Sequence, residues 1–334
     1  MVEAFIAAYQ ARRFKMATQD LYGVPITVDW ALDEKTGTAC VEAASCVGLT
    51  LYPPEIRYPM NSSSYGLGLL VKKVLARSDV KRIIIGLGGT GSNDGGIGFI
   101  AAFGAGFYDR QRCPLDPCTR NLERIAYIEK RTFHYNSRKP IIAACDVSNP
   151  LLGENGATYV FGRQKGLNPA LQREVESGME NLNRKVIQTF HVDMNRLEGS
   201  GAAGGLGGMI LGIFGATMLS GIDVLEKGGL FQKIQEADYV FTGEGQTDAQ
   251  TIHGKAVAQI AHLCKRADVP LICICGGMLP GAELLYHEGV SAIFSSADRA
   301  MSFSYALSHG PEKVEKQAYN VMRLILAAER RKRK

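Results

Sequence analysis

A strand, a glycine-rich loop and the start of a helix follow one another in Arg82-Ile-Ile-Ile-Gly86-Leu-Gly88-Gly89-Thr90-Gly91-Ser92-Asn93-Asp94-Gly95-Gly96. The apolar run of residues 82–86 is too short for a helix and ends at glycine, which favours a buried strand. The pattern from Asp94 to Phe103 is helical. Loops that join a strand to a helix lie at the carboxyl end of the sheet, where α/β proteins bind ligands. The stretch therefore predicts an α/β fold with a candidate site at this loop.

The same alternation continues along the chain. Residues 1–9 are apolar at helical spacing, and the segment to about Cys46 alternates as the strands of a β-meander do. We expect further strands and helices at the ranges that follow. The strands are Pro140–Ala144, Tyr239–Thr242, Leu271–Cys275 and Ala292–Ser295, and the helices are Ser64–Arg77, Gly254–Arg266 and Gly281–Glu288.

Composition is that of an ordinary soluble protein, with 334 residues, 46% apolar residues and 21% charged residues, and its length favours two domains. The net charge of +5 is concentrated in the five basic residues 330–334, which carry no aromatic residue between them, so we expect no nucleic-acid partner. Residues 199–222 carry no charge but include nine glycines, which favours a buried helix over a membrane span. Eight scattered cysteines indicate buried, reduced thiols and a cytoplasmic protein.

The first glycine-rich loop suits an anion, because exposed backbone N–H groups near a helix start attract negative charge. Asn93 is available to cap the helix. Gly86 to Gly91 also matches the G-x-G-x-x-G pattern of dinucleotide-binding proteins, with Asp109 near the place of the ribose-binding carboxylate. Against that alternative, residues 92–96 extend the loop where the helix should already have begun.

A second glycine-rich stretch, residues 199–208, precedes an apolar helix and either binds a ligand or allows close packing. The third cluster, residues 242–255, holds Glu244, Asp248 and Lys255 between a strand and a helix. Phosphoryl transfer needs such groups, because carboxylates hold Mg²⁺ and cations stabilise developing charge. Each residue also has a structural interpretation: Asp94 as a helix-start carboxylate, Glu244 and Asp248 as turn formers, and Lys255 as a solvated lysine.

A fourth segment begins with Cys145-Asp146 after a strand and continues to Gly166. In it, Arg163 and Lys165 are placed to meet a substrate that bears a carboxylate. The structural alternative is an ordered loop with asparagine and glycine turns.

Together these clusters resemble the type I glycerate kinase family over essentially the whole chain. The matching stretches are Asn61–Gly66, Gly88–Gly96, Ala144–Gly153, Val160–Gly166, Gly201–Gly205 and Thr242–Lys255. The resemblance implies transfer of phosphate from ATP to glycerate, with 2-phosphoglycerate the expected product, and therefore an enzyme that uses ATP and Mg²⁺. It also implies a small-molecule substrate, no membrane partner and a place in organic acid phosphorylation, and it leaves a homodimer open.

The resemblance implies a two-domain α/β protein with the active site in the cleft between the domains. A Rossmann-like domain would comprise residues 1–7 and 225–334, with a second α/β domain, residues 8–224, inserted in it. Family members normally begin with a further strand, loop and helix before a stretch like Val2–Ile6. We therefore expect the Rossmann-like domain to lack its N-terminal part, and a truncated, non-catalytic homologue is the first alternative. A dinucleotide-dependent oxidoreductase is the second.

The candidate site residues follow from the loops and the resemblance together. We expect Asp94, Asp248 and Lys255 to be catalytic, and Asp94, Glu244 and Asp248 to bind the metal. Replacement of Asp94 by Asn is expected to abolish turnover and to spare the fold. The expected nucleotide-binding residues are Gly88, Gly89, Thr90, Ser92, Asn93, Gly201, Gly204, Gly205 and Glu244.

Overall fold

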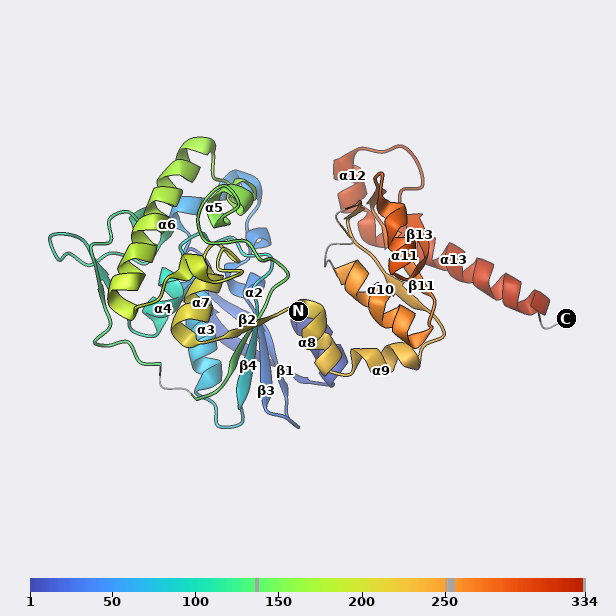
Figure 1. Cartoon of the computed structure of the whole chain (residues 1–334), viewed down its shortest axis with the longest axis horizontal. Helices are drawn as coiled ribbons and strands as arrows, with labels where there is room; N and C mark the ends of the chain where they lie inside the picture. The colour runs from blue at the N-terminus through green and yellow to red at the C-terminus, as the bar shows by residue number, and fades with distance from the viewer. Residues whose placement is uncertain (136–137, 250, 252–255, 333–334) are drawn as a thin grey trace. The chain divides into compact units, whose positions relative to one another are not determined.

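The computed structural model describes residues 1–135, 138–249, 251 and 256–332. It is an α/β structure, as expected, and its contacts divide it into two compact units, residues 1–228 and 229–334 (Figure 1). The expected boundary was between residues 224 and 225. Helix α1 (Val2–Tyr9) contacts β2, β3 and α8 within the first unit. The assignment of residues 1–7 to a Rossmann-like domain with residues 225–334 stays a prediction.

The first unit is built on a six-stranded sheet with the strand order β1-β2-β3-β4-β7-β8. The first three strands form an antiparallel meander, and β3, β4, β7 and β8 are parallel. Their carboxyl ends therefore meet at one edge of the sheet. The strands are β1 (Arg12–Gln19), β2 (Pro25–Asp33), β3 (Thr38–Glu42), β4 (Arg82–Gly86), β7 (Ile141–Ala144) and β8 (Thr217–Leu219).

Helices cover both faces of this sheet. The larger core lies on the face with α3, α4 and α7, where the sheet contributes Trp30, Ile83 and Ile85, all at most 2% exposed. The other face packs Cys40 and Ile84 against Phe5 of α1 and Val224 of α8. The helices of this unit are α2 (Ala44–Val47), α3 (Tyr65–Leu75), α4 (Ile97–Ala102), α5 (Ala157–Phe161), α6 (Pro169–Phe190), α7 (Leu206–Phe214) and α8 (Gly221–Lys227), and a hairpin joins β5 (Gly106–Tyr108) to β6 (Tyr127–Glu129).

Two details of the first unit differ from the sequence prediction. Helix α4 begins at Ile97, three residues later than expected, because Gly95 and Gly96 have φ angles of +63° and +79° and cannot be helical. The cap assigned to Asn93 is wrong, since Asp94 accepts the hydrogen bonds at this helix start.

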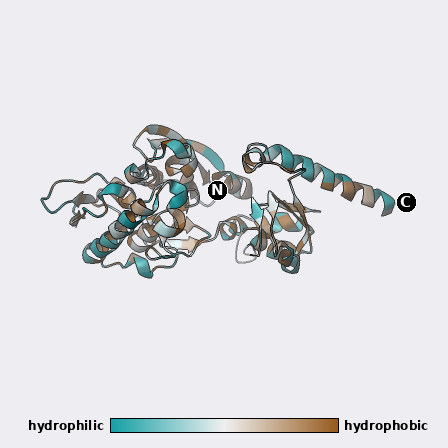
Figure 2. Ribbon diagram, turned by 90° about the horizontal axis from the view of Figure 1, so that it is seen from above, coloured by the Kyte–Doolittle hydropathy of each residue, from teal (hydrophilic) through white to brown (hydrophobic). Residues whose placement is uncertain are grey.

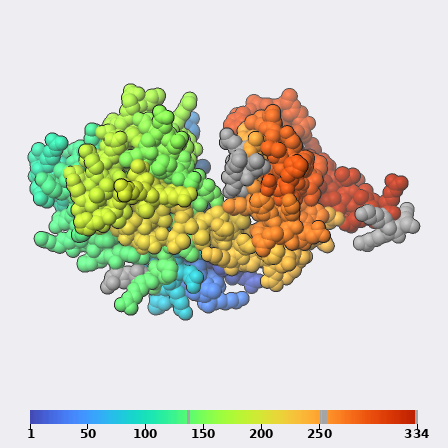
Figure 3. All heavy atoms as spheres, in the orientation of Figure 1, coloured from blue at the N-terminus to red at the C-terminus, as the bar shows by residue number. Residues whose placement is uncertain are grey.

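The expected buried helix in residues 199–222 is confirmed as α7, and no helix among the described residues is both long and apolar enough to cross a membrane. Residues around α6 form part of the outer surface of this unit (Figure 3).

The second unit contains a parallel three-stranded sheet with the order β13-β11-β9. Ile272 and Ile274 of β11 pack against Val321 of α13, and the alternate residues point to the opposite face, as strand geometry requires. Polar and apolar residues alternate along α13 (Figure 2). The elements are α9 (Leu230–Gln235), β9 (Val240–Thr242), β10 (Gln246–Thr247), α10 (Ala256–Ala267), β11 (Leu271–Cys275), β12 (Gly277–Met278), α11 (Leu285–Glu288), β13 (Val290–Ser295), α12 (Phe303–Ser308) and α13 (Gly310–Lys332).

The expected strands and helices are thus confirmed to within a few residues at their ends. The start expected for the helix at Gly254 lies outside the described residues. All eight cysteines are free, and five of them are buried, whereas Cys113 is exposed and Cys118 and Cys145 are half-buried.

Candidate active site

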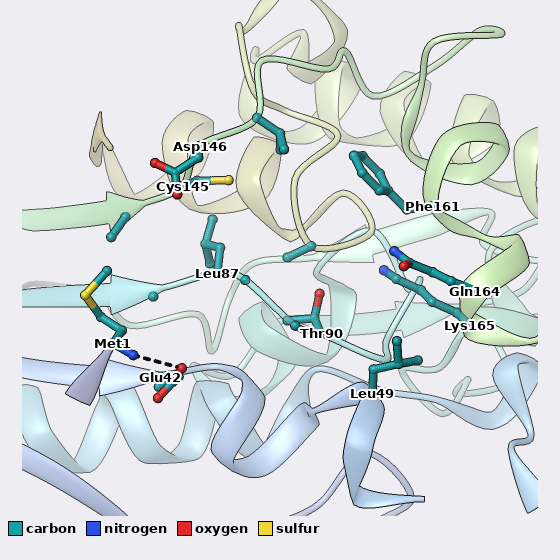
Figure 4. Close-up of a pocket in the computed structure, with 16 residues that line it drawn as sticks. Met1, Glu42, Leu49, Leu87, Thr90, Cys145, Asp146, Phe161, Gln164 and Lys165 are labelled. Atoms are coloured by element: carbon teal, nitrogen blue, oxygen red, sulfur yellow. Dashed lines mark hydrogen bonds and ion pairs between the residues drawn. The ribbon is translucent and has the colours of Figure 1, made fainter. Parts of the chain in front are cut away.

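A cavity of about 440 Å³ opens in the first unit at the carboxyl ends of β3, β4 and β7. This is where parallel strands present the loops that follow them, and where α/β folds commonly bind ligands. Figure 4 shows Lys165 and Gln164 entering it from one side and Asp146 and Cys145 at the end of β7. Its wall is formed by Met1, Glu42, Leu49, Gly86, Leu87, Gly88, Gly89, Thr90, Ala144, Cys145, Asp146, Val147, Phe161, Gln164, Lys165 and Ala203.

The first glycine-rich loop contributes Gly88, Gly89 and Thr90 to the cavity wall. Two backbone hydrogen bonds of 2.8 Å anchor the loop to residues 47–49, one from Leu49 N to Gly89 O and one from Gly91 N to Val47 O. Within the described part of the chain, no acceptor binds the backbone N–H groups of Gly88 and Gly89, and both glycines are exposed. Two free N–H groups on an anchored loop are suited to bind an anion.

Ser92 and Asn93 lie beneath this loop and do not line the cavity. Both are fully buried, and their side-chain polar atoms have no hydrogen-bond partner among the described residues. Of the nucleotide-binding residues predicted on this loop, the structure therefore gathers Gly88, Gly89 and Thr90 at the cavity and places Ser92 and Asn93 behind them.

Asp94 is also fully buried, and protein donors already occupy its carboxylate. Oδ2 accepts hydrogen bonds from Ser64 N at 2.7 Å, Ser64 Oγ at 2.8 Å and Gly98 N at 3.1 Å, and Oδ1 accepts one from Gly96 N at 3.1 Å. Burial raises the pKa of the carboxyl, and these donors oppose the rise. The geometry favours the helix-start interpretation, in which Asp94 fixes the shape of the loop.

Lys165 is the buried cation of the cavity wall. It is 3% exposed, and its Nζ donates a hydrogen bond of 2.6 Å to the carbonyl oxygen of Ser92. Burial lowers the pKa of Lys165 to about 7, and the negative charge of Asp94 partly opposes that effect. Arg163, two residues earlier, is exposed and is not part of the cavity wall. The structure therefore separates two cations that the sequence had grouped.

The end of β7 contributes a carboxylate. Asp146 is exposed, and its Oδ1 accepts a hydrogen bond of 2.9 Å from Gly221 N at the start of α8. No described residue donates a hydrogen bond to Oδ2. Asp146 is therefore oriented by the fold and retains an oxygen for a ligand.

The second glycine-rich stretch packs against the first. Gly95 N donates a hydrogen bond of 3.0 Å to Gly204 O, and a Cβ on Gly204 would overlap the carbonyl oxygen of Ser92. A Cβ on Gly201 would overlap Pro150 O, and one on Gly205 would lie 2.8 Å from the Cα of Gly95. These three glycines are buried, and the residue of this stretch that lines the cavity is Ala203. Close backbone packing thus accounts for Gly201, Gly204 and Gly205.

The third cluster lies in the second unit, on the loop after β9. Thr251 Oγ1 donates a hydrogen bond of 2.8 Å to Glu244 Oε1 and accepts one of 3.2 Å from Asp248 N. One fully buried hydroxyl therefore links the segments that carry both predicted carboxylates. Glu244 and Asp248 are half-buried, and Lys255 lies outside the described residues.

The donor set of this loop fits Mg²⁺. This ion is usually bound through one or two carboxylates, with water and phosphate oxygens completing its shell. Glu244 and Asp248 supply two carboxylates on one short loop, and no larger group of three His, Cys, Asp or Glu residues that could hold a metal occurs within the described ranges.

The dinucleotide alternative finds no support in this geometry. Asp109 lies in the turn after β5, where its Oδ1 accepts hydrogen bonds from Gln111 N and Cys113 N. It lines a different pocket, of about 340 Å³, from the one that Gly88 and Gly89 line. The carboxylate that should bind the ribose is therefore absent from the wall of the loop's own cavity.

Comparison with known proteins identifies the family. The model of the glycerate kinase family matches residues 1–326. The chain belongs to the glycerate kinase family. The resemblance in the sequence, the α/β fold class and the prediction of a kinase are thereby confirmed.

Relatives in this family match most of the chain. A glycerate kinase of Halalkalibacterium halodurans is 32% identical over 322 residues, which are 96% of this chain and 84% of that protein. A glycerate 2-kinase of Escherichia coli is 35% identical over 297 residues, 88% of this chain and 77% of that protein. The crystal structure of a putative glycerate kinase 2 from Salmonella typhimurium LT2 has a TM-score of 0.77 and 33% identity, covering 99% of this chain and 87% of that chain.

In this member of the glycerate kinase family, the sequence pointed to the first loop and to the segment that carries Cys145, Asp146 and Lys165, and it did not point to the other residues of the wall. Leu49, Gln164 and Ala203 line the cavity and were not predicted. The signal that could have found Gln164 was its place beside Lys165 in one of the stretches that resemble the family. No comparable local signal marks Leu49.

Proposed function

We propose that this chain transfers the γ-phosphate of ATP to a hydroxyl of glycerate and forms 2-phosphoglycerate, with Mg²⁺ as the metal. Family membership and the Escherichia coli relative named glycerate 2-kinase support the reaction and the position of transfer. The reaction belongs to organic acid metabolism. We further propose a cytoplasmic location, no nucleic-acid or membrane partner, and the domain arrangement with residues 8–224 inserted between residues 1–7 and 225–334.

The observation that carries the proposal is the cavity of the first unit. It combines the free N–H groups of Gly88 and Gly89 with the buried ammonium of Lys165 and the oriented carboxylate of Asp146. Glycerate and ATP are both anions, so these donors suit them. Asp146 is suited to accept a hydrogen bond from the hydroxyl that attacks, since no described residue donates to its Oδ2.

Glu244 and Asp248 are the proposed metal ligands, with Lys255 as a proposed phosphate contact. When bound, Mg²⁺ would neutralise charge on the phosphates. The chain's own contribution is the Thr251 hydroxyl, which donates a hydrogen bond to the Glu244 carboxylate and accepts one from the backbone N–H of Asp248. Asp94 acts in this proposal by fixing the loop that carries Gly88 and Gly89.

A coupled assay of ADP release tests the proposal. The full chain should release ADP when D-glycerate, ATP and Mg²⁺ are present together, and omission of D-glycerate or addition of EDTA should stop the release. Asp146→Asn should lower kcat by about 100-fold if the carboxylate orients the hydroxyl. Arg110→Gln, on the wall of the separate pocket near Asp109, is the control that should retain wild-type rates. A folded chain that releases no ADP with D-glycerate would contradict the proposal.

A further inference from the structure

The ammonium of Lys165 has an unusual environment for a lysine. Its side chain lines the cavity, yet it is almost fully buried, and its one hydrogen bond among the described residues is donated to the carbonyl oxygen of Ser92. An ammonium has three N–H donors. Among the described residues, no second acceptor and no carboxylate within ion-pair distance contacts Nζ. Buried charges are normally paired, so this one is incompletely satisfied by the protein.

Asp94 does not complete the pair. Its negative charge influences Lys165, but its two oxygens already accept four hydrogen bonds from Ser64, Gly96 and Gly98. The remaining polar capacity of the Lys165 ammonium is therefore available to a ligand in the cavity. The free backbone N–H groups of Gly88 and Gly89 line the same cavity, so two amide donors and one ammonium share it.

We propose that the Lys165 ammonium donates a hydrogen bond directly to an oxyanion of one of the substrates. Its hydrogen bond to Ser92 O would then fix the position of this oxyanion relative to the first glycine-rich loop. The proposal rests on the function proposed above, because carboxylate and phosphate oxygens are the oxyanions that the reaction would bring. A bound oxyanion would supply the acceptors that the protein does not provide. The hydrogen bond to Ser92 O makes the position of the ammonium depend on the loop that carries Gly88 and Gly89.

Protonation of Lys165 should then control binding. Burial lowers the pKa of this lysine to about 7, so the free protein would hold a neutral amine at pH 8.5, and an anion would bind there only with uptake of a proton. Several other titratable or charged groups surround Lys165 or line the cavities beside it. They are Asp94, Arg57, Tyr22, Tyr52, Cys145, Asp146, Glu42 and the amino group of Met1.

The test measures binding of D-glycerate and of Mg-ATP, each alone, by calorimetry with the full chain between pH 6.5 and 8.5. We expect Lys165→Met to raise the Kd of at least one of them by about 10- to 100-fold. A rise for D-glycerate identifies the carboxylate as the oxyanion, and a rise for Mg-ATP identifies a phosphate. Arg163→Met removes the neighbouring exposed cation and should leave both Kd values unchanged.

The pH arm separates binding from a structural role. For the wild type, the Kd of the affected ligand should rise by about tenfold between pH 7.5 and 8.5. Lys165→Arg keeps the charge at every pH tested, so its Kd should be independent of pH over this range. If Lys165→Arg kept the wild-type slope, another group would be titrating and the inference would be wrong.

If the Kd values of both ligands were unchanged in Lys165→Met, the inference would also be wrong, even if the turnover of this variant were lower. Thermal unfolding of each variant shows that the compared proteins are folded. Failure of the proposed function is a separate result: a wild type that binds D-glycerate with this pH dependence, but releases no ADP, would retain the oxyanion site and exclude the reaction.

Discussion

The carboxylate of Asp94 holds the first glycine-rich loop in its shape. All of its four hydrogen bonds come from the chain itself, two of them from N–H groups of the turn that starts α4. Replacement by asparagine must place an amide NH₂ opposite at least one of these donors. The sequence alone had favoured loss of turnover with the fold intact, and the buried contacts change that expectation.

Asp94→Asn should lower the free energy of unfolding by about 2–4 kcal/mol, because a buried donor would face another donor. Urea unfolding measures the change. Asp109→Asn, in a partly exposed turn, is the matched control and should change the value by less than about 1 kcal/mol. Wild-type stability together with lost turnover in Asp94→Asn would restore a catalytic role for this residue.

The hydroxyl of Thr251 is expected to support the proposed metal site. Thr251→Val removes the hydroxyl that donates to Glu244 and accepts from Asp248 N, so both segments lose a constraint. We expect the concentration of Mg²⁺ needed for half-maximal rate to rise by about 5- to 10-fold.

Thr247→Val is the control for Thr251→Val. The Thr247 hydroxyl is buried and faces the thiols of Cys273 and Cys275, away from the hydrogen bonds that Thr251 makes, so its loss should leave the Mg²⁺ dependence unchanged. Equal Mg²⁺ dependence in the two variants would remove Thr251 from the account of the metal site.

Gly204 and Gly88 lie on neighbouring loops, and alanine at the two positions should have different effects: on packing at Gly204 and on ligand binding at Gly88. Gly204→Ala should lower the free energy of unfolding by about 2–4 kcal/mol, since its φ is +69° and a methyl group would overlap Ser92 O. Gly88→Ala should change it by less than about 1 kcal/mol, because no atom lies within 4 Å of the added Cβ. The same methyl group would stand in the cavity, so we expect KM to rise by about tenfold. Steady-state kinetics and urea unfolding of both variants check the contrast.

The elements themselves were largely predictable from the sequence, and the reason is visible in β4 and β11. Each is a short apolar run that glycine ends, and each lies between two parallel neighbours in its sheet, where both faces are buried. The start of α4 was harder to place, because Gly95 and Gly96 adopt positive φ angles that composition alone does not reveal.

The site was less predictable than the elements. Polar residues in a loop give no signal of whether they point outward or inward, and Asp94 and Lys165 both point inward. The second glycine-rich stretch, about a hundred residues later, packs onto the same loop through Gly204. Such long-range packing has no local signature in the sequence.

The stability of the first unit should depend on pH through Lys165. Below about pH 7 the folded protein carries a buried charge, and this cost is fully present. Between pH 7 and about 10 the unfolded chain retains a proton that the folded protein releases, so stability rises with pH by up to about 1.4 kcal/mol per unit. Lys165→Met lacks this term. The difference in unfolding free energy, variant minus wild type, should therefore decrease as pH rises from 7 to 9 in urea unfolding, and an increase would contradict the assigned pKa.

For the whole molecule, family membership, the cavity loops of the first unit and the loop after β9 in the second unit all support the proposed phosphoryl transfer. The first unit has a cavity lined by donors that suit an anion, and the second carries the carboxylates of Glu244 and Asp248 after β9. These are the parts that ATP-dependent phosphorylation of a hydroxy acid requires.

The most direct test is ³¹P NMR of the product formed by the full chain from D-glycerate, ATP and Mg²⁺. We predict a new phosphomonoester signal that matches authentic 2-phosphoglycerate and grows as ADP appears. A folded chain that forms no phosphoglycerate under these conditions would contradict it.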